Sequence, residues 1–314
     1  MTSLVFIAMP GNEVMAARLA ALAQGELATL ETRQFPDGES HLRLRTDVSN
    51  SQVAVVCTLD RPDGKFLPMV YAAAMARDLG AVRVGLVAPY LAYMRQDHRF
   101  KSGEAVTSTY FARLISNSFD WLVTVAPHLH RHTSLDEIYS IPSTVVHANA
   151  ALSRWIQGNV ADPLIVGPDA ESAQWVTAIA ADVPCPYAVL SKHRLGDREV
   201  DIAKPNMDIW RARQPILVDD IISSAATMIE AARLLAELGM PKPICVGIHG
   251  LFAERAYERL MKGVAHIATT NTVPHESNEI DLGPLIAGAV KCIAPRGYGV
   301  AGYPSDGSED REQS

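Results

Sequence analysis

The stretch PILVDDIISSAATMIEAARLL, residues 215–235, combines a strand, a loop and a helix in one short run. Ile216–Val218 is apolar throughout, which predicts a buried strand, and the acids Asp219 and Asp220 follow it directly. After a loop of small residues, Ala226–Leu238 has the period of a helix. An apolar strand that leads through a short loop into a helix is typical of a parallel sheet covered by helices.

The same alternation of apolar runs and helical stretches extends along the rest of the chain. The predicted strands are Leu4–Met9, Val53–Leu59, Val82–Pro89, Trp121–Val125, Leu164–Val166, Ile216–Val218, Ile244–Ile248 and Ile267–Thr270. The predicted helices are Glu13–Gln24, Leu67–Leu79, Ser108–Ser116, Ala148–Ile156, Ser172–Ala181, Ala226–Leu238 and Glu254–Met261. This alternation predicts an α/β fold of doubly wound parallel sheets, in which ligands bind at the carboxyl ends of the strands.

The length of 314 residues predicts two domains, because a domain usually contains about 100–200 residues. The two halves share a rhythm of strand, polar loop and helix without a residue-level repeat, which is compatible with an internal duplication. We place the domains at residues 1–146 and 147–303. We expect the tail, residues 304–314, to be disordered because it is rich in Ser, Asp, Glu and Gly.

The composition is that of a globular protein that acts on neither nucleic acids nor membranes. Hydrophobic residues make up 48% and charged residues 20%, and the net charge of −7 argues against general nucleic-acid binding while allowing local basic pockets. The N-terminus has no basic region, and its apolar run is too short for a signal peptide or a membrane span, so we expect a cytoplasmic protein. The scattered cysteines predict buried free thiols, not disulfides or a zinc site: Cys57, Cys185, Cys245 and Cys292.

The loop after Asp219 and Asp220 has the features of an anion site. Backbone amides at a helix N-terminus, together with the hydroxyls of Ser223 and Thr227, can hold a phosphate. The two carboxylates cannot favour that phosphate, but they suit ribose hydroxyls or a metal bound to them. Acids followed by an anion cradle therefore fit a sugar phosphate, and the alternative is a strand-to-helix turn with an Asp or Ser cap.

This loop resembles the phosphoribosyl diphosphate loop of type I phosphoribosyltransferases and ribose-phosphate diphosphokinases. Four further stretches resemble the diphosphokinases in the family's order: FPDGE (35–39), APYLAYMRQDHRFKSGEAVTS (88–108), VTVAPHLHRHTSLDEIY (123–139), and VGPDAESAQW (166–175) with SKHRLGDREV (191–200). Ordinary phosphoribosyltransferases are shorter and lack FPDGE and RQD, and Ser223 is similar to the archaeal and related variants. The resemblance implies two tandem domains of the type I phosphoribosyltransferase kind, with ATP on the N-terminal side and ribose 5-phosphate on the C-terminal side.

The segment FPDGE is expected to bind adenine. Gly38 permits a tight turn in which backbone and carboxylates face one ligand. The resemblance implies that Phe35 stacks on the base and that Asp37 and Glu39 accept hydrogen bonds from it, across a subunit boundary. It therefore also implies a homo-oligomer, at least a dimer. The residues alone favour a polar hairpin turn.

The RQD segment is expected to bind the rest of the nucleotide. A cationic cluster at the end of an apolar strand suits a polyphosphate, and the alternative is a solvated charged loop. The resemblance implies that Arg95 and Gln96 lie at the ATP phosphates and adenine, and that Asp97 and His98 line the same site.

Three histidines, His128, His130 and His132, alternate along the chain and would share one side of an extended segment, which could indicate a metal cluster. The resemblance supports only His128 as a ligand of the ATP-bound Mg²⁺, directly or through water, because Mg²⁺ prefers oxygen. His130 and His132 are then structural or support a phosphate pocket. The resemblance also places Asp169 near the ribose and the metal.

Lys192 and Arg194 are the expected catalytic cations. An isolated Lys-His-Arg run would by itself indicate a solvated surface, but the resemblance places these cations on a loop that closes over the triphosphate. In the implied reaction the 1-hydroxyl of ribose 5-phosphate attacks the β-phosphorus of ATP and AMP leaves, which requires mainly positioning and charge neutralisation. Asp219 and Asp220 would hold the ribose hydroxyls, and the 5-phosphate would be held by Ser223, Ser224, Ala225, Ala226 and Thr227.

Two departures from the family pattern suggest an alternative to the catalytic function. Most members carry an acid where this chain has Ala126, and glycine where it has Ala225 and often Ala226. Two alanines in the loop predict backbone with φ < 0, or some strain. The alternative is a non-catalytic regulatory or binding paralogue, against which the retention of Lys192 and Arg194 argues. A phosphoribosyltransferase that consumes phosphoribosyl diphosphate would leave FPDGE and RQD without a purpose.

Overall fold

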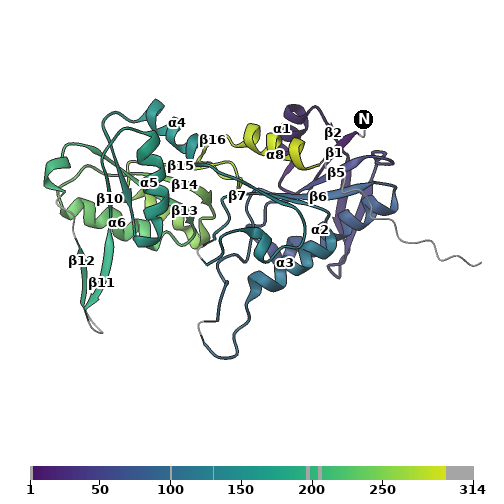
Figure 1. The fold of residues 1–314 in the computed structure, drawn as a ribbon, viewed down its shortest axis with the longest axis horizontal. Helices are drawn as coiled ribbons and strands as arrows, with labels where there is room; N and C mark the ends of the chain where they lie inside the picture. The colour runs from purple at the N-terminus through teal and green to yellow at the C-terminus, as the bar shows by residue number, and fades with distance from the viewer. Residues whose placement is uncertain (1–2, 100, 130, 196–198, 204–206, 295–314) are drawn as a thin grey trace, which may run out of the picture.

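The computed structural model describes residues 3–99, 101–129, 131–195, 199–203 and 207–294, with side chains from 191 to 206 left out. The described chain forms two six-stranded sheets, in which all neighbouring strands pair in parallel (Figure 1). The predicted fold class, two doubly wound α/β units in tandem, is confirmed. The expected disordered tail, 304–314, lies outside the described residues.

The first sheet has the strand order β2 (Glu26–Leu27), β1 (Leu4–Ala8), β5 (Gln52–Val56), β6 (Arg83–Ala88), β7 (Leu122–Val125) and β8 (Ser143–Val146). Its helices are α1 (Glu13–Ala23), α2 (Pro62–Asp78) and α3 (Thr107–Ser118), and η1 (Leu135–Glu137) is a short 3-10 turn. Alternate residues of β1 belong to two different apolar clusters, with Phe6 in one and Ile7 in the other. Both faces of the sheet are therefore covered, as its apolar strands require.

The second sheet has the order β10 (Tyr187–Val189), β9 (Pro163–Gly167), β13 (Gln214–Ile222), β14 (Ile244–Gly250), β15 (His266–Thr270) and β16 (Asn278–Ile280). The later helices are α4 (Asn149–Asn159), α5 (Ala173–Asp182), α6 (Ala226–Glu237), α7 (Ala256–Met261) and α8 (Gly283–Ile293), with 3-10 turns at η2 (Ala170–Ser172), η3 (Asp208–Trp210) and η4 (Ala253–Arg255). Among these helices, none is both long enough and apolar enough to cross a bilayer.

The two sheets have the same topology. In each half the second strand lies at one edge beside the first, and the remaining strands follow in chain order. Each half also carries an antiparallel hairpin between its second and third sheet strands: β3 (Leu30–Gln34) with β4 (Ser40–Leu44), and β11 (Ser191–Leu195) with β12 (Glu199–Ala203). The shared rhythm of the sequence thus corresponds to a repeated topology.

The two halves exchange their last helices. Helix α8 packs against α1, β7 and β8 of the first half, whereas α4 packs against α5 and β16 of the second (Figure 1). Arg18 of α1 pairs with Asp281, just before α8, at 2.9 Å. One apolar cluster runs through both halves as a result. The predicted boundary after residue 146 separates the strands of the two sheets and places α4 with the sheet it covers, whereas α8 covers the first sheet from beyond the boundary.

Several elements differ from those predicted. Strand β13 continues past Val218 to Ile222, because β14 continues to pair with it as far as Ile222↔Gly250, so Asp219 and Asp220 lie inside the strand. The short strands β2, β8, β10 and β16, the strands of the two hairpins and helix α8 were not predicted, although a hairpin turn was predicted at residues 35–39. Three cysteines are buried or half-buried, as expected, but Cys292 is exposed on α8.

The first sheet leaves no room for a side chain at Gly85 of β6. A Cβ at this position would overlap the ring of Trp121, which is fully buried. We expect Gly85→Ala to lower the free energy of unfolding by about 1–3 kcal/mol, since overpacking a core displaces its side chains. Urea unfolding measures this change.

The matched control is Gly158→Ala on α4, where an added Cβ meets no atom within 4 Å. This variant should be neutral or more stable by up to about 1 kcal/mol, because alanine favours a helix. Equal stability of the two variants would contradict the packing described for β6.

Candidate functional site

A polar cleft lies where the carboxyl ends of strands from the two halves meet. Its volume is about 130 Å³. The first half contributes Arg95, from the loop after β6, and His128, from the loop after β7. The second half contributes Asp169 and Glu171 after β9, Asp219 and Asp220 in β13, and residues 221–228. A cleft at strand carboxyl ends is the usual ligand site of such sheets.

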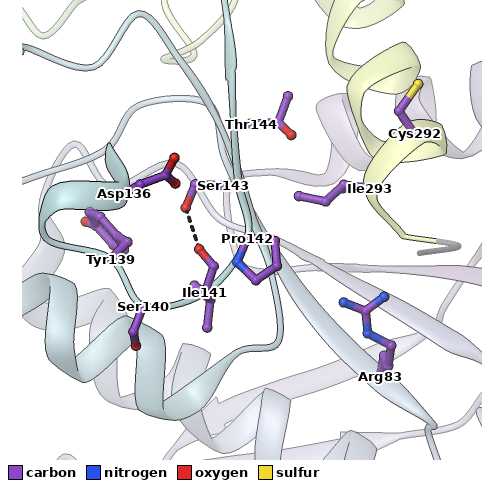
Figure 2. A pocket seen from close by; sticks show the side chains of 10 residues that line it. All are labelled: Arg83, Asp136, Tyr139, Ser140, Ile141, Pro142, Ser143, Thr144, Cys292 and Ile293. Carbon is purple, nitrogen blue, oxygen red and sulfur yellow. Dashed lines mark hydrogen bonds between the residues drawn. The ribbon is translucent and has the colours of Figure 1, made fainter. Parts of the chain in front are cut away.

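A much larger cavity, about 1170 Å³, lies elsewhere (Figure 2). It is lined by residues at the amino ends of β6 and β8, such as Arg83 and Ser143, and by the end of α8. None of the predicted site residues whose side chains the structure describes lines it.

The loop 223–227 is held in place from behind. Its carbonyl groups accept hydrogen bonds from the segment after β14: Ala253 donates to the oxygen of Ser223 at 3.1 Å, and Arg259 donates to that of Ser224 at 3.2 Å. Helix α6 begins at Ala226, and the first amides of a helix have no intrahelical acceptor. The loop therefore combines fixed carbonyls with amides and hydroxyls that border the cleft, which suits an anion.

Ala225 has a left-handed backbone conformation, with φ at +57°. The sequence predicts that the loop alanines either keep φ < 0 or are strained. Ala225 is strained, at a cost of roughly 1–2 kcal/mol. Its carbonyl accepts the amide of Ile229 at 2.9 Å, and its methyl group is buried in the core of the second half. Ala226 is helical.

Asp220 bonds across the seam between the halves. Its Oδ2 lies 2.8 Å from Nδ1 of His128, and both side chains are largely shielded from solvent. Burial opposes ionisation of Asp220, but the hydrogen bond and charge of His128 outweigh it and lower the pKa of that carboxyl.

Asp219 has the opposite environment. Burial raises the pKa of Asp219, and the charges of Asp220 and Asp169 raise it further. Asp169 itself uses one carboxylate oxygen to cap η2, where it accepts the amides of Glu171 at 3.1 Å and Ser172 at 3.2 Å. Together with Glu171, four carboxylates therefore border one small cleft, and among them Asp220 is the one bonded to His128.

The adenine segment lies outside the cleft of its own chain. Phe35, Asp37 and Glu39 occupy the turn between β3 and β4, which is closed by a 2.8 Å bond from the amide of Phe35 to the oxygen of Glu39. Gly38 has φ at +92°, as the tight turn requires. The Phe35 ring is 38% exposed and carries the guanidinium of Arg33 at 4.5 Å from its centroid. The local prediction of a polar hairpin turn is confirmed.

Of the RQD segment, only Arg95 lines the cleft. Gln96 accepts a hydrogen bond from the hydroxyl of Thr107 at the start of α3. The side chain of Asp97 is 3% exposed and pairs with His98 at 3.0 Å and with Arg131 at 2.9 Å. Asp97 therefore ties the loop after β6 to the loop after β7. Arg131 was not among the predicted site residues, although it stands between His130 and His132 in the sequence.

Lys192 and Arg194 lie on β11, opposite Ile202 and Val200 of β12. The side chains of Lys192 and Arg194 lie outside the described part of the structure, and so does the whole of His130. The β11–β12 hairpin projects from the body of the second half (Figure 1). His132 bonds through Nδ1 to Glu137 at 2.8 Å and does not line the cleft.

Comparison with known proteins gives consistent matches along the chain. Residues 4–118 match the sequence model of the N-terminal domain of ribose phosphate pyrophosphokinase, and residues 134–284 match that of the phosphoribosyl transferase domain. The ribose-phosphate pyrophosphokinase of Sulfolobus acidocaldarius is 33% identical over 272 residues, covering 84% of this chain and 91% of that protein. That of Methanopyrus kandleri is 31% identical over 294 residues, covering 93% and 100%.

A solved structure shares the fold. The crystal structure of phosphoribosylpyrophosphate synthetase from Mycobacterium smegmatis superposes with a TM-score of 0.82, over 93% of this chain and 99% of that one, at 21% identity.

The strain at Ala225 is open to a direct test with a pair of glycine variants. Glycine removes the penalty of the left-handed conformation at residue 225, whereas at residue 226 it only weakens the first turn of α6. We expect Ala225→Gly to be more stable than Ala226→Gly by about 1–2 kcal/mol in urea unfolding. Equal stabilities, or the reverse order, would show that the loop does not hold Ala225 under strain.

Proposed function

Since the chain belongs to the ribose-phosphate pyrophosphokinase family, we propose that it transfers the diphosphoryl group of ATP to the 1-hydroxyl of ribose 5-phosphate, giving phosphoribosyl diphosphate and AMP. The family suggested by the five sequence segments is confirmed by the relatives. The observation that carries the proposal is the single cleft in which the 223–227 loop of one half faces Arg95 and His128 of the other.

The sugar phosphate would bind to the second half. The amides at the start of α6 and the hydroxyls of Ser223 and Thr227 would hold the 5-phosphate, and they are supported by the anchored carbonyls of the loop. Asp219 and Asp220 border the same cleft, and would accept hydrogen bonds from the ribose hydroxyls. This arrangement would direct the 1-hydroxyl toward the first half.

The nucleotide would bind to the first half. Arg95 would pair with the phosphates at the cleft, and Lys192 and Arg194 would stabilise the charge that develops on the bridging and leaving oxygens. Phe35, Asp37 and Glu39 stand outside this cleft in their own chain, so a second copy of the chain would supply them to the adenine. The active unit would then be a homo-oligomer.

The residues at the cleft fit Mg²⁺. Within the described ranges, no three His, Cys, Asp or Glu groups already form a metal cluster, but Mg²⁺ usually takes few protein ligands and completes its shell with phosphates and water. Four carboxylates border the cleft, and a metal-binding histidine commonly donates its other ring N–H to a carboxylate, as His128 does to Asp220. His128 and Asp169 would hold the ion. When bound, it would neutralise charge on the transferring phosphates.

The second candidate is a regulatory or binding paralogue without activity. It is favoured by the positive φ angles of Ala126 (+34°) and Ala225 (+57°), because both positions carry non-glycine residues in an unfavourable conformation beside the cleft. The predicted reaction and this candidate differ in one measurable product, AMP.

Purified protein with Mg²⁺, ATP and ribose 5-phosphate should release AMP and phosphoribosyl diphosphate in equal amounts. Lys192→Ala should lower the turnover rate by about 10²–10³-fold, by analogy with the loss of one transition-state donor. The matched control is Lys242→Ala, an exposed lysine whose ammonium bonds to the carbonyl of Lys262. Chromatographic separation of the nucleotides measures AMP, and conversion by an added phosphoribosyltransferase measures phosphoribosyl diphosphate.

Absence of AMP above the level of Lys192→Ala, with Mg²⁺, Mn²⁺ and Co²⁺ tried in turn, would support the paralogue instead. Recovery of AMP release in a variant with Ala126→Asp and Ala225→Gly would then assign the loss to these two positions.

A further inference from the structure

His249, near the carboxyl end of β14, is a buried histidine that contacts both halves of the molecule. It is 1% exposed. Its Nδ1 lies 2.9 Å from Oγ1 of Thr272 in its own half, and its Nε2 lies 3.4 Å from the carbonyl oxygen of Ala126 in the other. The ring of Tyr90, also from the first half, packs edge-on at 4.9 Å between centroids. His249 therefore lies at the seam, outside the lining of the cleft.

The partners of His249 define its tautomer. Burial lowers the pKa of His249 to about 4, so the ring is neutral at neutral pH and carries one proton. A carbonyl oxygen only accepts hydrogen bonds, so the proton is on Nε2 and points to Ala126. The hydroxyl proton of Thr272 is then shared between Nδ1 of His249, at 2.9 Å, and the carbonyl oxygen of Ile248, at 3.1 Å, while the carbonyl of Thr272 accepts the hydroxyl of Thr58 at 2.6 Å. Contacts from both halves of the molecule thus hold the Nε2–H donor of His249 in place.

Ala126 is the point at which this bond can affect the cleft. It has φ at +34°, is 3% exposed, and donates its amide to the oxygen of Val146 at 3.0 Å. His128 follows only two residues later. A residue in this conformation keeps it only while its surroundings hold it there. The bond from His249 is the side-chain contact that holds the Ala126 carbonyl.

The same pair of strands supplies the second contact of the His128 segment. His249 is paired with Ile221, the residue after Asp220, and Asp220 bonds Nδ1 of His128. Strands β13 and β14 thus hold the segment 126–128 at two points, the carbonyl of Ala126 and the ring of His128. A shift at the first point would alter the direction in which His128 enters the cleft.

We propose that His249 is a positioning residue, which fixes the Ala126 backbone through Nε2–H and thereby sets the position of the His128 ring. The expected effect of His249 on the binding of metal and nucleotide rests on the proposed function. Its expected effect on the position of the His128 ring does not. A histidine that served only to fill the core would have no such effect on His128.

The proposal is tested by two neutral amides that differ only in reach. In His249→Gln the side-chain amide reaches the position of Nε2 and can still donate to Ala126. In His249→Asn it reaches only the position of Nδ1, so the contact to Ala126 is lost while a partner for Thr272 remains. His275→Asn is the control, because His275 is half-buried and bonds to Ser277 within its own half.

The first readout is independent of activity. In protein labelled with ¹⁵N-histidine, the ring nitrogens of His128 should keep their wild-type chemical shifts in His249→Gln and His275→Asn, and should change in His249→Asn. His249→Phe, which keeps the volume of the ring but donates no hydrogen bond, should behave like His249→Asn and replaces it if that variant does not fold. Equal shifts in the glutamine and asparagine variants, or none in the asparagine and phenylalanine variants, would overturn the proposal.

The second readout concerns the site. The affinity for Mn²⁺ in the presence of a non-hydrolysable ATP analogue, measured by electron paramagnetic resonance, should fall about 10–100-fold in His249→Asn, as for other residues that orient a metal ligand, and little in His249→Gln. The turnover rate should follow the affinity, while the KM for ribose 5-phosphate stays unchanged, since the 223–227 loop is anchored by Ala253 and Arg259. A rise in that KM alone would contradict the proposal. If the wild type releases no AMP, the proposed function fails, and the His128 shifts still decide the positioning role.

Discussion

The hydrogen bond between His128 and Asp220 joins the two halves at the point where their strand ends meet. The residues are 92 positions apart, and the atoms lie 2.8 Å apart in a largely buried setting. The bond requires a fixed orientation of the two sheets, which the exchanged helices α4 and α8 and the continuous apolar cluster provide. Without His128, the buried charge of Asp220 would stand beside Asp219 with no nearby donor from the first half, which is costly in a protein interior. The cleft therefore depends on both halves for its charge balance.

The carboxylates of the cleft repel one another, so the site favours a bound ligand that relieves this repulsion. Asp169, Asp219 and Asp220 are close enough that the first and third raise the pKa of the second, on top of its burial. His128 compensates the charge of Asp220 and lowers the pKa of that carboxyl. A cation, or a sugar whose hydroxyls donate to these oxygens, would relieve the remaining repulsion. The loop proposed to bind the 5-phosphate stands next to these acids at the start of α6, so the order of residues along β13 and α6 would suit a ligand with both phosphate and hydroxyl groups.

The sequence predicted what depends on local patterns. Apolar runs identified the long central strands, and the small-residue loop before α6 was expected at a ligand site and lines the cleft. Long-range packing was beyond its reach: α8 covers the first sheet, and no pattern within α8 indicates which half it joins. The same limit applies to side-chain partners. Asp97 was expected at the nucleotide, but its carboxylate is buried against Arg131, a contact between two loops that come together only in the folded chain. The Asp220 partner of His128 likewise has no local signal.

The two alanines that depart from the family pattern are the places where local preference and tertiary structure disagree most. Ala126 and Ala225 both have positive φ; Ala225 lines the cleft, and Ala126 lies two residues before His128, which also lines it. Glycine would adopt these angles more easily, but it would also increase the freedom of the unfolded chain and of the loops themselves. Alanine allows fewer backbone conformations than glycine. The contacts around each of these alanines offset the energetic cost of its strained conformation. The carbonyl of Val146 and the ring of His249 hold Ala126 at the seam, while the helix bond from Ile229 and the buried methyl group hold Ala225. Strain at these positions is thus a consequence of a cleft held from both sides.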